Sequence, residues 1–432
     1  MSRKTLVVAC SVVLVLAVAL FAVACGSTTT TTTVAPGGDT TTTAAGGTTT
    51  TAGGATGETI KIGSLFPVTG DLAKLGQDCV NGLKLAIEEI NAAGGVKSMG
   101  GAQLALVEAD SQGKPDVGVA EVQRLATKDN VAAIVGTYQS GVGVPATAEA
   151  EKQQVPIVIS MAVADAITNS GQKYTFRICP KSDFYAKYQI LFVKDLKNLV
   201  GLDVKKVALL HEDTDFGTSM ATGQKKYAKE AGIEVTTEVA YPASAADLTT
   251  QVSKVKASNP DLVLTTTYLN DSILIMQAKE KLGMKQFFFD AAGGTVEGDF
   301  IKRLGATAEN VLTEIEFSKY AKGADVLNQK FKDKYGTDIT GNSAYSYQAG
   351  YVIADALERA GTVDRVALRD AFAATNMPPG PTMVLPTQGK PLQFGPDGQN
   401  LNAPLFVVQV QNGELTPVWP ADLFQGKVNL PQ

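Results

Sequence analysis

The sequence predicts an α/β fold with two lobes, each built from a parallel β-sheet flanked by helices. From Ile60 onward, strand patterns and helix patterns alternate along the chain, which is typical of parallel sheets covered on both faces. The pattern starts again after residues 176–180, so the second half repeats the construction of the first. The chain has 432 residues, whereas a single domain rarely exceeds about 250–300 residues. Two lobes of similar architecture therefore account for both the length and the pattern.

Four strands and three helices are expected in the first lobe. Residues 60–66 form an apolar run that indicates a strand, and Leu83, Ile87 and Ile90 share one face of the helix after it, which Gly94 ends. The expected strands are 60–66, 104–108, 132–135 and 156–159, and the expected helices are 77–92, 117–128 and 141–153.

The second half of the chain repeats this alternation and adds a different tail. The expected helices are 183–196, 216–231, 248–257 and 271–282, and the expected strands are 204–210, 234–241, 262–266 and 286–289. Two further helices are expected within 323–375, because Ala349, Val352 and Ala356 line one apolar face. The tail predicts strands at 405–410 and 415–419, joined by Asn412 and Gly413, a pair typical of hairpin turns.

The first 24 residues have the pattern of an export signal. Arg3 and Lys4 precede an apolar run at 5–24, and small residues stand directly before Cys25. This arrangement resembles a bacterial lipoprotein signal, in which the cysteine is acylated and becomes the first residue of the mature chain. An uncleaved signal anchor and a plain cleaved signal are the alternatives, since an apolar run of about 20 residues can span a membrane. We expect residues 1–24 to be removed and Cys25 to carry a lipid anchor on the extracytoplasmic side of the cell membrane.

Residues 25–57 are expected to form a disordered tether. Of the 31 residues at 26–56, 15 are Thr, most of the others are Gly or Ala, and Asp39 is the only charge. Such a segment buries too little apolar surface to offset the entropy lost on ordering. A flexible chain of this length spans roughly 30 Å, which is enough to hold a folded body away from a membrane.

The composition excludes several classes of function. The formal net charge is −5 and the pI is about 5.2, so no basic face for nucleic acid is indicated. One histidine, His211, and four cysteines are too few for a His/Cys zinc site. The sequence also lacks the phosphate-loop, nucleophile-elbow, His-Glu-x-x-His and Cys-x-x-Cys motifs. No catalytic residue, metal or cofactor is therefore expected.

Two features around residue 140 invite a functional interpretation. Residues 141–146 match the Gly-x-Gly-x-x-Gly/Ala pattern of dinucleotide sites, which keeps an NAD-dependent dehydrogenase as an alternative, although the match follows the third strand and contains Pro145. Ser140 is placed to cap the helix that begins there, where free backbone N–H groups attract an anion such as a carboxylate. A cap without any ligand is an equally good interpretation of Ser140.

Three other residues are candidates for chemistry. His211 lies at a strand end beside Glu212 and is interpreted as a loop-edge residue rather than a base. Cys79 and Cys179 could pair, since an exported chain permits a disulfide. Isolated cysteines are more often small buried residues, and both interpretations of this pair stay open.

Seven short stretches occur in an order and spacing that a known family shares. They are 60–76, 86–95 (AIEEINAAGG), 135–140, 156–160, 176–183 (FRICPKSD), 210–217 and 261–268. Through them the chain resembles the solute-binding proteins of ABC importers, of the leucine/isoleucine/valine-binding type, over residues 58–420.

The resemblance implies a periplasmic-binding-protein-like I fold, in which three crossing segments join two α/β lobes and a ligand binds in the cleft. The implied crossings lie near 178–181, 314–317 and 393–396. One lobe would combine 58–178 with 315–392, and the other would combine 179–314 with 395–420.

A ligand site is also implied, residue by residue. Ser140 would help to hold the carboxylate of the ligand, and Ala162 and Ala164 would offer main-chain groups at the next strand end. Phe216 and Tyr268 would be the aromatic residues that close from the other lobe. The implied ligand-binding residues are Tyr138, Ser140, Ala162, Ala164, Phe216, Tyr268 and Asp290.

The chain departs from the family pattern at the ammonium end of the ligand. The glutamate that the family offers there maps to Ala292. A buried ammonium needs a counter-charge or several hydrogen-bond acceptors. Asp290, Asp165 and Asp271 are the candidates for this role, and the sequence does not choose among them.

The expected function is that of an extracytoplasmic receptor that delivers a small solute to an ABC permease. An amino acid of the branched-chain type, or a related small carboxylate or amide, would bind between lobes that close about a hinge. We expect no cofactor and no nucleic-acid partner, and we expect a monomer tethered to the membrane. A ligand sensor coupled to a membrane receptor kinase is a further alternative.

Overall fold

The computed structural model describes residues 58–291, 293–318, 324–380, 383, 385, 389–421, 424 and 426–430. The predicted signal segment, Cys25, the Thr-rich tether and Ala292 lie outside these residues. The described residues all belong to one compact unit. None of the helices in this part of the chain combines the length and the apolar character needed to cross a membrane.

The first lobe is built on a five-stranded sheet whose strands all run parallel, in the order β2-β1-β3-β4-β5. The strands are β1 (Ile60–Phe66), β2 (Leu104–Asp110), β3 (Ala133–Gly136), β4 (Ile157–Ile159) and β5 (Thr175–Arg177). The sequence predicts the first four, with small shifts at their ends. It does not predict β5, whose sequence Thr-Phe-Arg lacks the continuous apolar run that marks the equally short β4.

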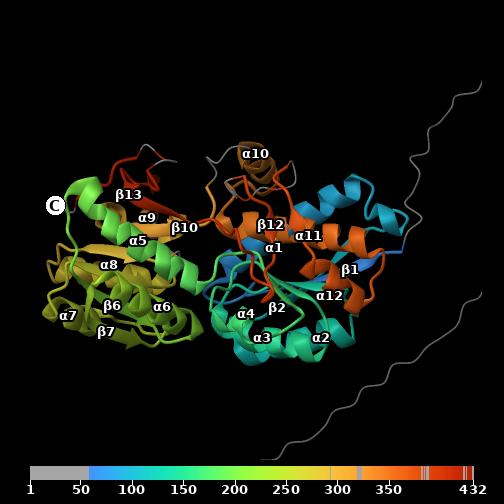
Figure 1. The fold of residues 1–432 in the computed structure, drawn as a ribbon, viewed down its shortest axis with the longest axis horizontal. Helices are drawn as coiled ribbons and strands as arrows, with labels where there is room; N and C mark the ends of the chain where they lie inside the picture. The colour runs from blue at the N-terminus through green and yellow to red at the C-terminus, as the bar shows by residue number, and fades with distance from the viewer. Residues whose placement is uncertain are drawn as a thin grey trace, which may run out of the picture. The chain divides into compact units, whose positions relative to one another are not determined.

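The helices of the first lobe come from two separate parts of the chain. They are α1 (Ala73–Ala92), α2 (Pro115–Thr127), α3 (Ser140–Lys152), α4 (Ala166–Asn169), α10 (Ala324–Tyr335), α11 (Gly341–Ala360) and α12 (Arg365–Ala373). Figure 1 shows α11 beside α1, although the two helices are far apart in the sequence. The sequence predicts two helices within 323–375, and the structure has three in this region. Helix α11 ends separately from α12 because Gly361 takes a left-handed conformation, with φ of 61°.

Helix α1 begins at Ala73 rather than at the predicted residue 77, and Gly76 explains the difference. Glycine is unfavourable inside helices, so the pattern places the start of the helix after it. In the structure a Cβ at Gly76 would lie 2.1 Å from the carbonyl oxygen of Pro67. A Cβ at Gly82 would likewise lie 2.0 Å from the carbonyl oxygen of Ser343 on α11. Both glycines therefore let α1 approach its neighbours more closely than any side chain would allow.

The second lobe is built on a seven-stranded sheet in the order β14-β13-β10-β9-β8-β6-β7. The strands are β6 (Lys206–Glu212), β7 (Glu234–Tyr241), β8 (Leu262–Thr266), β9 (Phe287–Asp290), β10 (Leu312–Ile315), β13 (Phe406–Gln411) and β14 (Glu414–Trp419). Strand β13 runs antiparallel to both β10 and β14, and the other pairs are parallel. The predicted turn at Asn412 and Gly413 is confirmed, with φ of 54° and 77°.

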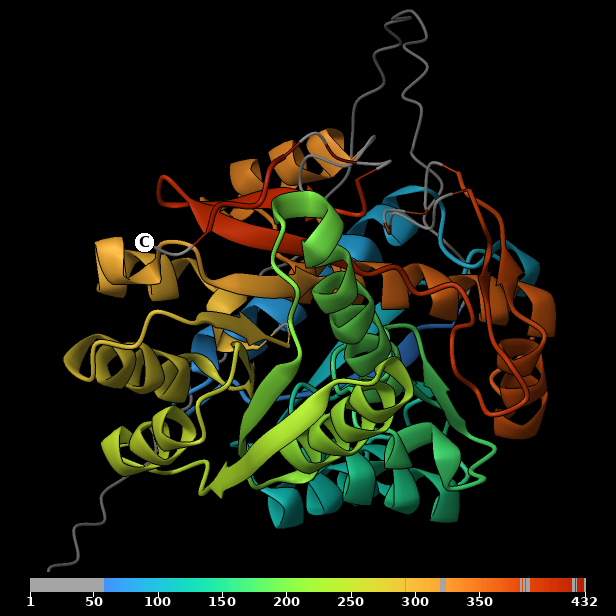
Figure 2. The ribbon, with the colours of Figure 1, turned by 60° about the vertical axis from the view of Figure 1, so that its left-hand side comes forward.

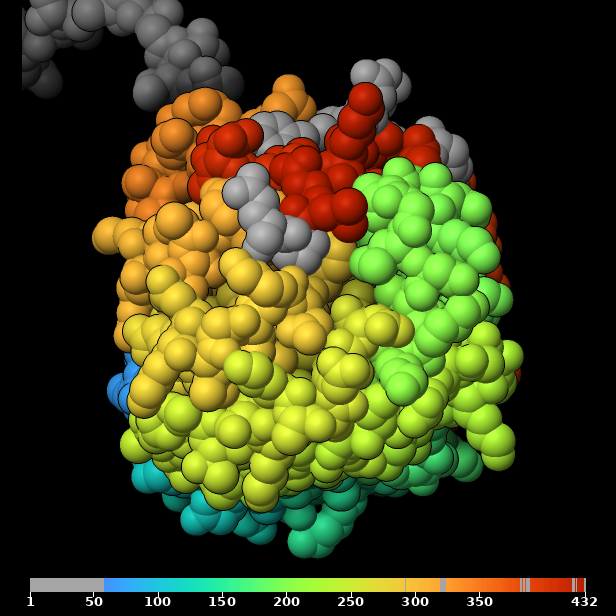
Figure 3. Space-filling model, turned by 90° about the vertical axis from the view of Figure 1, so that its left-hand side faces the viewer, coloured from blue at the N-terminus to red at the C-terminus, as the bar shows by residue number. Residues whose placement is uncertain are grey.

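The second lobe has its own helices and a packed C-terminal hairpin. The helices are α5 (Ser182–Val200), α6 (Asp215–Ala231), α7 (Thr249–Ala257), α8 (Leu269–Lys281) and α9 (Gly298–Leu304), and the short 3-10 turns of the chain are η1 (Lys97–Met99), η2 (Gly294–Val296) and η3 (Gly305–Ala308). Figures 2 and 3 show α5 in green beside the C-terminal strands in red. The indole of Trp419 on β14 donates a hydrogen bond to Asp195 of α5 at 3.0 Å, which ties the hairpin to this helix.

The chain passes between the two sheets three times. It leaves the first sheet after β5, leaves the second sheet after β10, and returns to the second sheet between β12 (Leu392–Gln393) and β13. Strand β12 pairs only locally, with β11 (Asn376–Met377), in an antiparallel ladder. Two parallel-sheet lobes with flanking helices confirm the predicted α/β fold.

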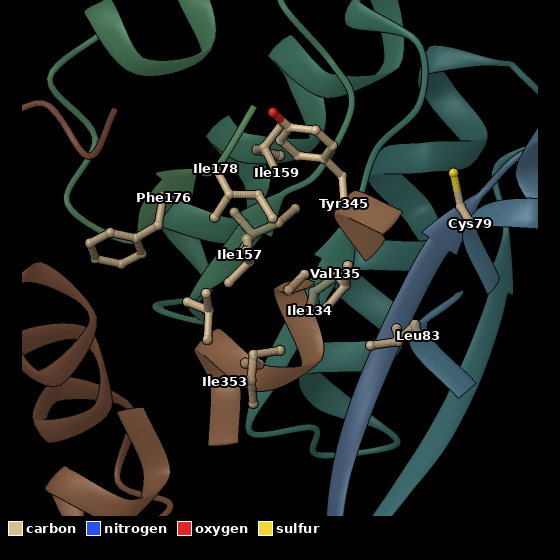
Figure 4. Packing of buried hydrophobic residues seen from close by; sticks show 14 of the residues in the cluster. Cys79, Leu83, Ile134, Val135, Ile157, Ile159, Phe176, Ile178, Tyr345 and Ile353 are labelled. Atoms are coloured by element: carbon tan, nitrogen blue, oxygen red, sulfur yellow. The ribbon is translucent and has the colours of Figure 1, made fainter. Parts of the chain in front are cut away.

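The apolar core of the first lobe lies between its sheet and its helices. Figure 4 shows Tyr345 and Ile353 of α11 among strand residues such as Ile157, and all three are essentially inaccessible to solvent. The same apolar cluster continues into Phe216 and Ala291 of the second lobe. The two lobes therefore share buried surface in this structure.

Candidate functional site

A small cavity lies where strand ends of the two lobes meet. The carboxyl ends of parallel strands are the usual place for ligands in α/β folds, because loops converge there. The cavity measures about 30 Å³, and its lining residues are Tyr138, Ser140, Met161, Val163, Tyr185, Phe216, Tyr268, Ala291, Gly293 and Glu316. Four of the predicted ligand-binding residues, two from each lobe, are therefore brought together.

Aromatic residues close the cavity from both sides. The ring centroids of Tyr138 in the first lobe and Tyr268 in the second lobe are 6.3 Å apart, and Phe216 lies 5.5 Å from Tyr268. Burial raises the pKa of the Tyr138 and Tyr268 phenols well above 10, so both remain neutral hydrogen-bond donors. The backbone N–H of Asp165 also donates to the hydroxyl of Ser219 across the lobes, at 3.0 Å. These contacts describe a closed cleft.

Ser140 lies in the cavity, but the predicted capping role is wrong. Helix α3 begins at Ser140 itself, and the N-cap residue is Gln139, which makes no side-chain capping bond. The Oγ of Ser140 instead accepts hydrogen bonds from the backbone N–H groups of Val163 and Ala164, at 3.2 and 3.1 Å. Its hydroxyl proton has no acceptor among the residues that the structure describes. Ser140 can therefore still donate a hydrogen bond to a ligand.

Ala162 and Ala164 do not line the cavity, contrary to the sequence-based expectation. The N–H of Ala162 donates to the carbonyl of Thr137 at 3.0 Å, and the N–H of Ala164 is bound to Ser140. The carbonyl oxygens of both alanines accept from the guanidinium of Arg177. Their main-chain groups are thus already used inside the protein, and the side chains that reach the cavity are those of Met161 and Val163.

Arg177 is a buried cation that the sequence analysis does not identify as important. It is 0 % exposed. Its guanidinium donates to the carbonyl of Ala164 at 2.7 Å, to the hydroxyl of Thr168 at 2.8 Å and to the side chain of Gln399 at 2.6 Å. These acceptors compensate the buried charge and fix the loop between β4 and α4 against the third crossing.

Asp290 is not placed as a ligand-binding residue. Its carboxylate is fully buried and accepts hydrogen bonds from the hydroxyls of Thr265, Thr267 and Thr295, at 2.8–3.1 Å. Burial raises its pKa to about 6, and these bonds show that its role is to hold the ends of β8 and β9 together. It is absent from the described lining of the cavity.

The other two aspartates are not in this cavity either. Asp271 accepts a hydrogen bond from the phenol of Tyr241 at 2.7 Å, and burial raises its pKa to about 7. Asp165 accepts from the backbone N–H of Asp183 at 3.1 Å. Neither carboxylate lines the cavity within the described part of the chain.

Glu316 is the carboxylate that does line the cavity, and the sequence analysis misses it. It follows β10 at the second passage between the sheets, and it is 7 % exposed. It accepts a hydrogen bond from the phenol of Tyr185 at 3.2 Å, and burial raises its pKa to about 7. The only signal in the sequence is a charged residue inside the predicted crossing 314–317, where a strand pattern ends.

A larger cavity of about 300 Å³ adjoins the small one and shares Tyr138, Met161 and Glu316 with it. Glu297 also lines this larger cavity and is 5 % exposed. It accepts a hydrogen bond from the side chain of Asn342 at 3.2 Å, and burial raises its pKa to about 7. The volume is at the lower end of those typical for small-molecule sites.

Comparison with known proteins identifies the kind of protein that has this cleft. A family model described as periplasmic binding protein matches residues 59–414. The chain belongs to the periplasmic binding protein family. A protein of Brucella suis biovar 1 (strain 1330), named Leu/Ile/Val-binding protein homolog 7, is 32% identical in an alignment of 384 positions that covers 86% of this chain and 94% of that protein.

Solved structures of solute-binding proteins share the fold. The substrate-binding protein LivJ of a branched-chain amino acid transporter from Streptococcus pneumoniae, in complex with isoleucine, has a TM-score of 0.72 and 24% identity, and covers 83% of this chain and 98% of its own. A solute-binding protein of an ABC transporter from R. palustris, in complex with benzoate, has a TM-score of 0.72 and 17% identity. The match covers 83% of this chain and 95% of that protein.

Membership of this family makes the chain an extracytoplasmic binding protein, and not an enzyme. The dehydrogenase alternative is therefore wrong. The glycine pattern at 141–146 has a packing role instead, because a Cβ at Gly143 would lie 2.7 Å from the hydroxyl of Thr137 and 3.1 Å from the Cβ of Ala162.

The remaining candidates for chemistry have structural roles. His211 is a buried residue of β6 rather than a loop-edge residue, and its Nε2 lies 3.5 Å from Glu238. Cys79 and Cys179 are buried and free, so they form no disulfide with each other. Burial raises the pKa of the Cys179 thiol to about 12, which leaves it unreactive.

The buried carboxyls of the cleft predict a pH dependence of stability. Burial raises the pKa of Glu316 from 4.5 to about 7, so the folded state holds a proton that the unfolded state releases, and stability falls as the pH rises through this window. Glu316→Gln removes this titration. Urea unfolding of the ligand-free protein should show the variant gaining up to about 3 kcal/mol relative to wild type between pH 5 and pH 8. A difference that is the same at both pH values would contradict this assignment.

Proposed function

We propose that the chain is the solute receptor of an ABC importer, and that it binds an amino acid or a related small carboxylate or amide between its two lobes. The observation that carries this proposal is a closed cavity lined from both lobes by Tyr138, Ser140, Phe216 and Tyr268. The names of similar proteins support it, since one is a Leu/Ile/Val-binding protein homolog and another is in complex with isoleucine. The relative in complex with benzoate extends the class to carboxylates without an amine.

Binding and closure are coupled in this proposal. The lobes comprise 58–178 with 315–392 and 179–314 with 395–420, and they move about the three crossings. A ligand that contacts Ser140 in one lobe and Tyr268 in the other reaches both only when the cleft is closed. It therefore shifts the population from open to closed by its extra affinity for the closed form.

A ligand carboxylate is best accommodated at the start of α3. The first backbone N–H groups of a helix lack intrahelical partners and carry a partial positive charge. The hydroxyl of Ser140 adds a donor at the same place, and it is only 2 % exposed, so water competes little for it. Charge-assisted hydrogen bonds in such a site are among the stronger polar contacts in proteins.

The N-terminal segment gives this receptor its location. We infer that Cys25 is acylated, that residues 25–57 tether the lobes to the membrane, and that the closed monomer presents its solute to a membrane permease. The sequence pattern before Cys25 and the low-complexity composition after it support this part of the proposal.

Substitution of Ser140 tests the site. Calorimetry with the twenty standard amino acids and benzoate identifies the tightest-binding probe, and Ser140→Ala should weaken its binding by about 10- to 150-fold, because one charge-assisted hydrogen bond is lost. Tyr268→Ala should also weaken binding through lost packing.

Ser182→Ala is the matched control for Ser140→Ala. Its hydroxyl donates to the carbonyl of Val163 at 3.0 Å, so it holds the same loop but lies outside the described lining of the cavity. The control should lower thermal stability and leave affinity nearly unchanged. Equal losses of affinity in both variants, or none in either, would place the ligand elsewhere.

The lipid anchor has its own test. In a bacterial host fed labelled palmitate, the wild-type chain should carry the label and Cys25→Ala should not, because the acylated thiol is missing. The precursor of the variant should also keep its signal segment. Label on the variant would show that the attachment site is wrong.

A further inference from the structure

Two buried carboxylates of the cleft have no cationic partner among the residues that the structure describes. Glu316 and Glu297 are 7 % and 5 % exposed, and within the described part of the chain neither forms an ion pair. The hydrogen bonds from Tyr185 and Asn342 each occupy one oxygen of these carboxylates. No other side chain in the described part of the chain donates a hydrogen bond to either carboxylate.

Both carboxylates face the same space. The cavity of about 300 Å³ is lined by Glu297 and Glu316, and Glu316 also lines the small cavity at Ser140. The described lining of the two cavities contains no Lys, Arg or His. The charge of Lys74 opposes the rise in the pKa of Glu297, but the Lys74 ammonium is already paired with Asp78 at 3.0 Å.

The other residues that line the larger cavity supply no positive charge within the described part of the chain. Asp338 and Glu414 also line the larger cavity, and Asp338 is paired with Lys332 at 3.4 Å. The remaining wall is apolar and aromatic, with Phe317 and Tyr138 among its members, and aromatic faces attract cations. When the carboxyls of Glu297 and Glu316 are ionised, the interior of the cleft is therefore negative, and its described lining offers no cation to pair with them.

Charge balance then discriminates between classes of ligand. A buried charge without a partner is strongly unfavourable. A zwitterion such as leucine has no net charge, so two ionised carboxylates and bound leucine together still carry two negative charges. A ligand with one net positive charge reduces this total to one negative charge.

We propose that this cavity binds a ligand of net positive charge, a basic amino acid or a diamine, with its amino groups paired to Glu316 and Glu297. This inference rests on the proposed solute-receptor function and narrows its substrate class. Because Glu316 lies at the second passage between the lobes and Glu297 belongs to the second lobe, the cation also contributes to closure.

Calorimetry with defined probes tests the proposal. The cationic probes are L-lysine, L-arginine and cadaverine, and the comparison probes are L-leucine and benzoate. At least one cationic probe should bind 10-fold or more tightly than leucine. Glu316→Gln and Glu297→Gln should each weaken that binding by about 10-fold or more, since each removes one charged partner.

Two further variants separate charge from folding. Glu316→Asp keeps the charge and should retain more affinity than Glu316→Gln. Glu314→Gln is the matched control, because Glu314 lies on the same strand and is fully buried but lies outside the described lining of both cavities. It should change the affinity by less than about twofold, and thermal unfolding of each variant confirms that it is folded.

The outcomes distinguish this inference from the function on which it rests. Leucine or benzoate binding as tightly as every cationic probe, with Ser140→Ala weakening it, would overturn the inference and leave the receptor function in place. Cationic probes that bind equally well to wild type and to both Gln variants would also overturn it. No binding of any probe would contradict both.

Discussion

The buried guanidinium of Arg177 is the contact on which the cleft depends. It holds the loop after β4 through carbonyl oxygens of Ala162 and Ala164, and it holds the third crossing through Gln399. That loop in turn presents the backbone N–H groups that bind Ser140 and sets Val163 against the cavity. A buried charge is strongly unfavourable without hydrogen-bond acceptors, so these bonds connect the loop and the start of the third crossing to the edge strand of the first sheet.

The sequence predicts the fold well because its signals are local. Strands such as β1 and β8 are apolar runs with clear ends, and the Asn412–Gly413 turn needs positive φ values that these two residues tolerate. The start of α1 is predicted four residues too late, because Gly76 permits a close approach to Pro67 and does not break the helix. Long-range packing of this kind has no periodic signature.

The site is predicted only in part, for the same reason. Tyr138, Ser140, Phe216 and Tyr268 follow from family motifs at strand ends, and the fold brings those ends together. Asp290 lies outside the described lining of the cavity, and three threonine hydroxyls on neighbouring segments donate to it, a set of contacts that no spacing in the sequence reveals. Glu316 is missed because its importance comes from where the chain crosses between lobes.

Closure of the cleft on a solute makes the molecule more compact, and small-angle X-ray scattering measures this change. The radius of gyration of the purified protein is measured alone and with a saturating concentration of the probe that calorimetry shows to bind most tightly. Because the ligand contacts both lobes only when they close, the account predicts a smaller radius with the probe. An unchanged radius, with the cleft occupied according to calorimetry, would contradict it.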